Sequence, residues 1–339
     1  MSRSRILLTH TPDMRANYYG LRALGGLQAL ADVIMHEGAS PLTAAEIIRL
    51  AKGCQLIVSD RNTPGHSEIF PTIPDTIAFL RCAVDIRTID LAAASEAGVL
   101  ITQASPGFVA SVAEMAFGMM IDLARDVTRH ATDYRAGLNP QPRKGVQLSG
   151  ATIGLLGYGA IAHHVAKIAH AFGMTVLVND PYVTASEPYV KQVRLDEVLS
   201  QSDFVLPLAI ATNETENMIG EAALRRMKKS AFLINLSRGN LVDEAALEKA
   251  LDEKWIAGAA MDVGRATDQM PTPRLAGRAD VIATPHTAGL TPEAIEHQAM
   301  ETVAQAAEIL AGRIPKGAVN ADAASRMSRR FAQTGACRA

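Results

Sequence analysis

An apolar run that leads into two closely spaced glycines, followed by a helical pattern, constrains this chain more than any other feature. Residues 152–156 form the apolar run, Gly157 and Gly159 follow it, and the helical pattern begins directly afterwards. A second apolar run covers residues 175–178 and is closed by Asp180. The order strand, glycine turn, helix, strand and acidic residue is that of a βαβ unit whose helix starts beyond the carboxyl end of a strand.

Each of these positions suits a bound dinucleotide. Gly157 would allow the tight turn, and Gly159 would let the backbone approach a pyrophosphate at the positive end of the helix. Ala162 is the small residue that lets the helix pack closely on the strand. Asp180 is placed to accept both hydroxyls of the adenosine ribose and would repel a 2′-phosphate. The sequence therefore predicts a Rossmann site for NAD rather than NADP. The expected cofactor-binding residues of this unit are Gly157, Tyr158, Gly159, Ala160, Ile161 and Asp180.

Apolar runs alternate with helical patterns along the chain, which is typical of open parallel α/β sheets. The 339 residues predict about two domains, and a stretch with two prolines at residues 139–145 resembles a boundary between them. Ser111 and Glu114 fit a capping box that would start the apolar helix after them. The expected strands are residues 6–9, 32–36, 56–59, 77–81, 99–102, 152–156, 175–178, 204–208, 231–235, 256–262 and 281–284.

Composition narrows the class of protein. The net charge of −2 and the lack of a basic run exclude a general attraction to nucleic acid or to an anionic membrane surface. The richest apolar helical pattern, near residues 109–124, contains two carboxylates, which argues against membrane insertion. Three scattered cysteines, Cys54, Cys82 and Cys337, form no disulfide framework and favour the cytoplasm.

Three histidines, His163, His164 and His170, face away from the apolar side of the helical pattern that follows Gly159. Histidines grouped on one helix can indicate a metal site. No carboxylate or cysteine joins them at ligand spacing, so a solvated face is the favoured interpretation and no metal is expected.

Two polar residues follow strands of the glycine-containing half. Arg238 comes after the strand at residues 231–235, and His286 after the strand at 281–284. Ligands of open α/β sheets gather beyond the carboxyl ends of the strands. Hydride transfer to a keto acid needs a cation for the carboxylate and carbonyl and an acid for the new alkoxide. Each residue alone also suits a surface ion pair or a structural histidine, but their joint position favours catalysis.

Together these segments resemble the D-isomer-specific 2-hydroxyacid dehydrogenase family. The likeness runs from about residue 50 to about residue 320. The matching segments are Ser111-Val112-Ala113-Glu114, Gly157-Tyr158-Gly159, Asn235-Leu236-Ser237-Arg238-Gly239, Met261-Asp262-Val263 and Thr284-Pro285-His286.

The resemblance implies a dinucleotide domain inserted into a split, flavodoxin-like substrate domain, with the active site at the hinge. The implied divisions, which replace the boundary near residues 139–145, are 1–102 and 290–320 for the substrate domain, 103–289 for the NAD-binding domain and 321–339 for a C-terminal tail. Arg238 would bind and polarise the 2-oxo acid, His286 would be the acid/base, and Asp262 would contact the cofactor. The family is commonly a homodimer joined through its dinucleotide domains.

One departure from the family concerns the partner of His286. The family generally has a glutamate five residues after the aspartate of its Asp-Val pair, and Thr267 stands at that distance from Asp262. That glutamate favours the imidazolium, so its loss would end oxo-acid reduction at a lower pH than is usual for the family. We expect the Asp268 carboxylate to take its place. Thr267, Gln269 or water remain the alternatives.

A second departure concerns the substrate carboxylate. The family generally places glycines where this chain has Ala83, Val84 and Asp85. Asp85 would repel an anionic substrate if it pointed inward, but it can instead pair with Arg61 or Arg87. Arg61 also matches an arginine that is frequent in the substrate domain of the family, and we expect it to contact the distal end of the acid. The expected substrate-binding residues are Arg61, Ala83, Val84 and Arg238.

Two hypotheses follow. The first is an NAD-dependent enzyme that transfers a hydride between NADH and a 2-oxo acid or D-2-hydroxy acid. The second is a non-catalytic NAD(H)-binding regulatory protein, similar to corepressors of this fold. The missing glutamate favours the second hypothesis, whereas Arg238 and His286 oppose it.

Overall fold

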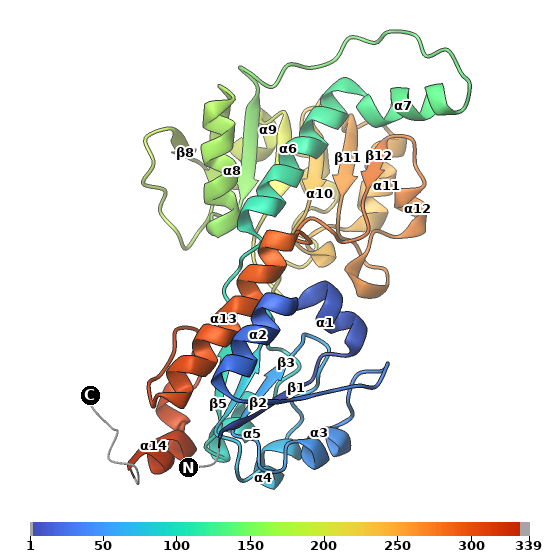
Figure 1. Cartoon of the computed structure of the whole chain (residues 1–339). Helices are drawn as coiled ribbons and strands as arrows, with labels where there is room; N and C mark the ends of the chain where they lie inside the picture. Colours follow the sequence, from blue (N-terminus) through green and yellow to red (C-terminus); the bar gives the residue numbers. More distant parts are fainter. Residues whose placement is uncertain (1–2, 333–339) are drawn as a thin grey trace. The chain divides into compact units, whose positions relative to one another are not determined.

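The chain forms two compact α/β units in the computed structural model, which describes residues 3–332 (Figure 1). Unit 1 contains residues 3–107 and 292–332, and unit 2 contains Phe108–Thr291. The chain thus leaves unit 1 after Gly107 and returns to it at Pro292. The two prolines at residues 139–145 lie inside unit 2 and mark no boundary.

Unit 1 is built on a five-stranded parallel sheet with the order β2-β1-β3-β4-β5. This is the flavodoxin-like order, in which helices cover both faces of the sheet. The strands are β1 (Arg5–Leu8), β2 (Asp32–Met35), β3 (Leu56–Ser59), β4 (Ala78–Arg81) and β5 (Leu100–Gln103). The helices are α1 (Pro12–Tyr18), α2 (Leu21–Leu30), α3 (Ala44–Leu50), α4 (Ile69–Thr72), α5 (Leu91–Glu96), α13 (Pro292–Leu310), η3 (Ala321–Ala323) and α14 (Ser325–Ala332).

The strands of unit 1 are apolar at nearly every position because both faces are covered. Along β1, Ile6 and Leu8 join the core beneath α2 and α13, whereas Leu7 joins the core beneath α3, α4 and α5. All three side chains are fully buried. The sheet therefore sits between two helical layers, and its polar loops are left at the ends of the strands.

Unit 2 is built on a seven-stranded parallel sheet with the order β12-β11-β10-β9-β6-β7-β8. Read from β8, this is the Rossmann order extended by one strand. The strands are β6 (Thr152–Leu156), β7 (Thr175–Asn179), β8 (Val190–Gln192), β9 (Phe204–Pro207), β10 (Phe232–Asn235), β11 (Gly258–Met261) and β12 (Val281–Ala283). The helices are α6 (Val109–Arg125), α7 (Val127–Arg135), α8 (Ala160–Ala171), α9 (Leu195–Gln201), α10 (Glu221–Arg226), η1 (Gly239–Leu241), α11 (Glu244–Asp252), η2 (Thr267–Gln269) and α12 (Pro273–Ala276).

Two apolar clusters hold this sheet. One joins α6 and α8 to one face, and the other joins α9, α10 and α11 to the opposite face. The chain between α7 and β6 has no helix or strand and runs as a long loop (Figure 1). Within residues 3–332, no helix combines the length and the apolar character needed to cross a membrane.

One expectation from the sequence is wrong, and two features of the structure add to what the sequence predicted. Ser111 does not cap α6, because the helix already begins at Val109; its hydroxyl instead lies 2.8 Å from that of Thr291. The edge strand β8 was not anticipated, because three partly exposed residues give no apolar run. The expected tail contains the helix α14, in which Met327 and Phe331 are buried. The rest of that tail, with Cys337, lies outside the described residues.

Candidate active site

The turn after β6 contains two glycines with different surroundings. Gly157 has a φ of +97°, and a methyl group on it would lie 2.6 Å from the Ala209 amide nitrogen. A methyl group on Gly159 would meet nothing within 4 Å, and this residue precedes the first turn of α8 without a side-chain cap. The backbone at Gly159 is therefore open to a ligand, as expected where a pyrophosphate approaches the positive end of a helix. These residues fit an NAD site.

Asp180 links this turn to the loop after β7. Its Oδ2 accepts a hydrogen bond of 2.7 Å from the Tyr158 amide, and its Oδ1 accepts from the amides of Tyr182 (2.8 Å) and Val183 (3.0 Å). Burial acts to raise the pKa of Asp180, but the three amide donors outweigh it, and the pKa lies below its usual value. The carboxylate is therefore charged at neutral pH.

A second link was not foreseen from the sequence. The hydroxyl of Tyr158 donates to Glu187 at 2.8 Å, and its ring stacks on His163 with centroids 3.9 Å apart. Nδ1 of His163 lies 2.9 Å from the Gly159 carbonyl oxygen, and its Nε2 lies 3.5 Å from Glu187. His163 thus belongs to the glycine turn, which corrects the expectation of a merely solvated histidine. Ala160 and Ile161 form the first turn of α8 beside it.

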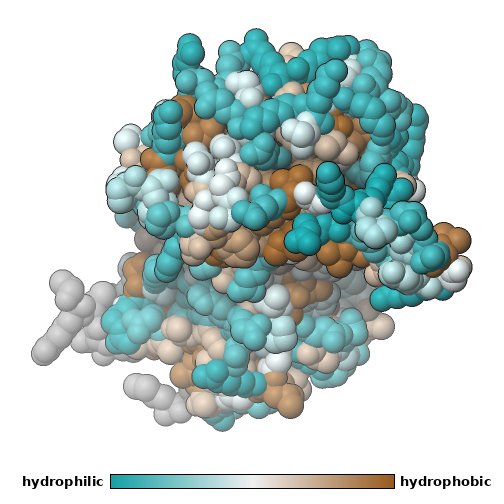
Figure 2. All heavy atoms as spheres, turned by 90° about the horizontal axis from the view of Figure 1, so that it is seen from above, coloured by the Kyte–Doolittle hydropathy of each residue, from teal (hydrophilic) through white to brown (hydrophobic). Residues whose placement is uncertain are grey.

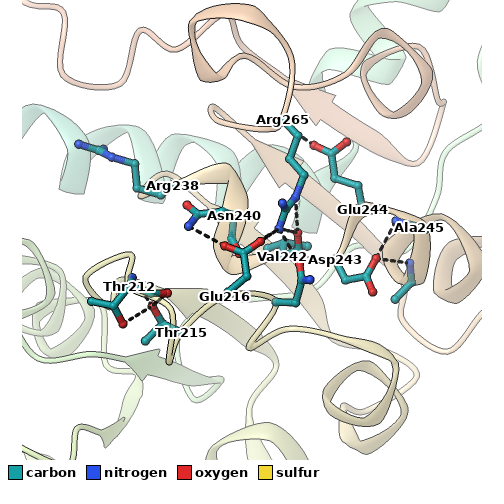
Figure 3. Close-up of polar contacts among 12 residues, drawn as sticks. Thr212, Thr215, Glu216, Arg238, Asn240, Val242, Asp243, Glu244, Ala245 and Arg265 are labelled. Atoms are coloured by element: carbon teal, nitrogen blue, oxygen red, sulfur yellow. Dashed lines mark hydrogen bonds and ion pairs between the residues drawn. The ribbon is translucent and has the colours of Figure 1, made fainter. Parts of the chain in front are cut away.

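Arg238 follows β10 in a turn that the buried Asn235 organises. The Asn235 side-chain amide donates to the Arg238 carbonyl oxygen at 2.9 Å, and its oxygen accepts from the Ser237 amide at 3.2 Å. A methyl group on the next residue, Gly239, would overlap the carbonyl of Gly264. The turn therefore packs directly on the loop after β11. Figure 3 shows the Arg238 side chain extending away from the polar cluster behind it.

Asp262 shapes the loop that carries His286. Its buried carboxylate accepts hydrogen bonds from the Thr284 hydroxyl (2.6 Å) and from the amides of Thr287 (2.8 Å) and Ala288 (2.9 Å). Its carbonyl oxygen accepts from the His286 amide at 2.9 Å. The resemblance implied a cofactor contact for Asp262, whereas in the structure its hydrogen bonds go to the loop of the histidine.

His286 is held by a main-chain carbonyl. Its Nδ1 lies 2.8 Å from the carbonyl oxygen of Asp268, to which it donates, so Nε2 is the nitrogen that can exchange a proton. This corrects the expectation that the Asp268 carboxylate would be the partner. His286, Asp268 and Gln269 all have φ between 56° and 59°, a left-handed conformation that is uncommon for residues with a side chain. Thr267 begins η2 in the same loop.

The expected substrate-binding residues of unit 1 follow β3 and β4. Asp85 accepts from the Arg87 guanidinium at 2.6 to 3.0 Å and from the Arg87 amide at 2.9 Å. The pairing with Arg87 anticipated as an alternative is therefore present. The Ala83 carbonyl accepts from the Ala104 amide at 3.0 Å, Val84 is half-buried, and Arg61 is exposed.

Unit 1 also contains a buried polar cluster that sequence reasoning missed. Arg81, at the end of β4, is fully buried and donates to the carbonyls of Asp60 and Thr63 and to the Thr88 hydroxyl. Burial, aided by the nearby Arg15 and Arg81, lowers the pKa of His10 to about 4 against the opposing effect of Asp60. These groups hold the strand-end loops of unit 1 together.

The chain is similar in sequence to proteins of known activity. The model of the NAD-binding domain of D-isomer specific 2-hydroxyacid dehydrogenases matches residues 117–288. A glyoxylate reductase of Korarchaeum cryptofilum is 32% identical over 88% of this chain and 92% of its own length. A D-3-phosphoglycerate dehydrogenase of Methanocaldococcus jannaschii is 31% identical, and the chain spans 57% of its length.

Solved structures of similar fold include members of the same family. A D-isomer specific 2-hydroxyacid dehydrogenase from Lactobacillus delbrueckii, in its NAD complexed form, has a TM-score of 0.78 at 27% identity and covers 94% of this chain and 100% of its own. The TT0316 protein from Thermus thermophilus has a TM-score of 0.81 at 28% identity and covers 93% and 99%. The non-catalytic alternative is not supported. The chain belongs to the D-isomer specific 2-hydroxyacid dehydrogenase family and is an NAD-dependent oxidoreductase of 2-oxo and D-2-hydroxy acids.

Proposed function

We propose that the chain reduces a short 2-oxo acid such as glyoxylate. NADH, when bound, supplies the hydride that is added to the carbonyl carbon. Arg238 binds the substrate carboxylate and polarises the carbonyl, and Nε2 of His286 donates the proton to the carbonyl oxygen. The observation that carries this proposal is the hydrogen bond from His286 Nδ1 to the Asp268 carbonyl, which leaves Nε2 as the proton-exchanging atom.

The substrate class is proposed from the relatives and from unit 1. Two relatives named glyoxylate reductase are covered by the chain over more than nine-tenths of their length. Ala83 and Val84 bring side chains to the loop where the family generally has glycines, which favours a small acid. We assign this loop and Arg61 to the substrate, and residues 157–161 and Asp180 to NAD.

The domain roles follow from the same residues. Unit 2 is proposed to bind the dinucleotide and unit 1 to bind the distal part of the acid. The two described cysteines, Cys54 and Cys82, are both buried and free, which favours a reducing compartment such as the cytoplasm.

A homodimer through unit 2 is proposed from exposed apolar side chains. Large apolar side chains gather along α6, α7 and the following loop, with exposed fractions from 39% to 65%, and such patches often mark interfaces. They are Ile121, Val127, Tyr134, Leu138 and Val146. Figure 2 shows apolar side chains gathered at several places on the face that it displays. Sedimentation velocity of the full chain decides between a dimer and a monomer.

The experiment for the activity is NADH oxidation over a panel of glyoxylate, hydroxypyruvate, pyruvate, oxaloacetate and bulkier 2-oxo acids. We expect the highest kcat/KM with a small acid and a loss of about 10²–10⁴-fold in Arg238→Ala. NADH binding, followed by fluorescence, should be retained in that variant and so controls for folding. Oxidation of NADH by none of these acids would overturn the proposal.

A further inference from the structure

We propose that Glu244 is a positioning residue for catalysis, because it braces the loop that presents the Asp268 carbonyl to His286. The loop in question is residues 264–272. The inference rests on the proposed role of His286. In this chain the Asp268 carbonyl, held in place by Glu244, would take the place of the glutamate that the family generally has beside the histidine.

One carboxylate holds both ends of the loop. Oε1 of Glu244 accepts a hydrogen bond of 2.9 Å from the Arg265 amide, and Oε2 accepts one of 2.8 Å from the Thr272 hydroxyl. A methyl group on Gly264 would lie 2.8 Å from the same Oε1, so the loop lies directly against the carboxylate. Glu244 therefore fixes the points at which the loop departs and returns.

Glu244 is not needed to cap its own helix. It is the first residue of α11, and the preceding Asp243 already accepts hydrogen bonds from the amides of Ala245 (3.0 Å) and Ala246 (3.1 Å). Figure 3 shows Asp243 directed at the helix amides and Glu244 directed at Arg265. The two adjacent carboxylates thus have separate tasks.

Between these two attachment points the loop closes on itself. The Gly264 amide donates to the Gln269 carbonyl at 2.7 Å, and the Ala266 amide donates to the Met270 carbonyl at 3.0 Å. The left-handed Asp268 lies within this closed turn. Glu244 fixes both ends of the loop, and hydrogen bonds within the loop fix its middle. The Asp268 carbonyl is therefore held in one orientation.

The side chain of Arg265 joins this loop to the turn that follows Arg238. Its Nη2 donates to the Asn240 carbonyl at 3.0 Å and pairs with Glu216 at 2.9 Å, and its Nε donates to the Val242 carbonyl at 3.3 Å. Figure 3 shows Arg265 reaching across to these groups. The brace therefore connects the loops of both proposed catalytic residues.

The chemical reason for such a brace lies in the acceptor. A carboxylate attracts an imidazolium over a range of orientations, whereas a neutral carbonyl orients the ring only through a well-aligned hydrogen bond. If the carbonyl moves, Nδ1–H loses its acceptor and the ring can rotate or change tautomer. Nε2 then no longer faces the substrate oxygen, while the dinucleotide turn after β6 is untouched.

The test compares Glu244→Ala with Glu244→Gln. The glutamine keeps one oxygen for the Arg265 amide, and its NH2 can donate to the Thr272 hydroxyl, so it should restore the brace. We expect kcat for 2-oxo-acid reduction to fall by about 10–10²-fold in Glu244→Ala and by no more than about threefold in Glu244→Gln. Thr272→Val, which removes one attachment only, should show a smaller loss in the same direction.

Two readouts separate positioning from a merely structural role. The solvent deuterium isotope effect on kcat should rise in Glu244→Ala, because proton delivery becomes limiting, while the Kd for NADH and the Tm stay near those of the wild type. Asp252→Ala is the matched control, since Asp252 lies on the same helix and pairs with Arg278 at 2.8 Å, away from the loop. An unchanged kcat and isotope effect in Glu244→Ala, or an equal loss in Glu244→Gln, would overturn the brace.

A measurement without turnover keeps this proposal distinct from the proposed function. Imidazole NMR of the full chain, with the signals of His286 among nine histidines identified by their loss in His286→Gln, reports which ring nitrogen carries the proton. We expect Nδ1–H in the neutral form of the wild type and a shift to Nε2–H in Glu244→Ala. If no 2-oxo acid is reduced, the proposed function fails, but this experiment still shows whether Glu244 determines the tautomer of His286. The same tautomer in both proteins would refute the brace.

Discussion

Both units of the molecule place loops at the carboxyl ends of a parallel sheet, yet these loops are held in different ways. In unit 2 close approaches of backbone to backbone accompany the side-chain hydrogen bonds of Asn235 and Asp262. Gly157 lies against Ala209, and Gly239 lies against Gly264. In unit 1 the buried Arg81 side chain donates to the loop carbonyls around it. Contacts that demand glycine leave a pattern in the sequence, whereas buried ion and hydrogen-bond clusters do not.

The largest effect should come from the glycine turn of unit 2. Gly157→Val places a branched side chain at a φ of +97° and against the Ala209 backbone. We expect the Kd for NADH to rise by about 10³-fold, ~4 kcal/mol, in a fluorescence titration. Gly159→Ala is the control, because open space surrounds that position in the absence of ligand. It should keep the wild-type Tm and still weaken NADH. If both variants bound NADH with the wild-type Kd, the turn after β6 would not be part of the cofactor site.

The next effect concerns the choice of cofactor. Asp180 holds a charged carboxylate at the end of β7, and like charges at close range cost several kcal/mol. We expect kcat/KM with NADH to exceed that with NADPH by about 10²-fold. Asp180→Asn should narrow this ratio by about tenfold or more. Equal efficiency of the wild type with both cofactors would contradict the assignment.

A smaller effect is expected in unit 1 when the pH falls. The pKa of the buried His10 is lowered from 6.5 to about 4. The unfolded chain therefore binds the proton more tightly, so the contribution to stability is complete above pH 6.5 and is lost toward pH 4. Between pH 7 and pH 5 the loss amounts to about 2 kcal/mol. Denaturant unfolding of the wild type and of His10→Phe at pH 7 and pH 5 measures this loss of unfolding free energy.

His10→Phe keeps a ring beside Tyr19, whose centroid lies 4.8 Å from that of His10, and removes the titration. The pH dependence of its free energy of unfolding should be correspondingly smaller than that of the wild type. Identical pH dependence in the two proteins would show that the polar cluster of unit 1 does not hold His10 uncharged.

The smallest effect should come from the Asp268 side chain. Because its carbonyl, not its carboxylate, accepts from His286, Asp268→Asn leaves the hydrogen bond in place. We expect the pH–rate profiles of the wild type and this variant to superimpose. A shift of the pH–rate profile in the variant would show that the Asp268 carboxylate is, after all, the partner of His286.

The comparison also explains what the sequence could predict. The strands, the dinucleotide turn and the positions of Arg238 and His286 at strand ends could all be inferred, because apolar periodicity and glycine spacing are local signals. β8 could not, since its three residues pack only partly. Nor could the start of α6, because the capping pattern at Ser111 falls inside the helix.

The partner of His286 lay beyond sequence reasoning for a clear physical reason. A side-chain partner can be sought among carboxylates at a given spacing, but every residue has a carbonyl. Only the left-handed backbone at Asp268 and the attachments to Glu244 select one of them. The same holds for Tyr158 and Glu187, which are 29 positions apart and joined by one hydrogen bond.

The central claim is that unit 2 carries the proton donor for reduction, and His286→Ala tests it most directly. Enzyme loaded with NADH is mixed with the best 2-oxo acid of the panel, and a single turnover is followed by the loss of NADH fluorescence. We predict a rate about 10²–10⁴-fold below that of the wild type, with the Kd for NADH within about threefold. A wild-type rate in His286→Ala would contradict the account and place the proton donor elsewhere.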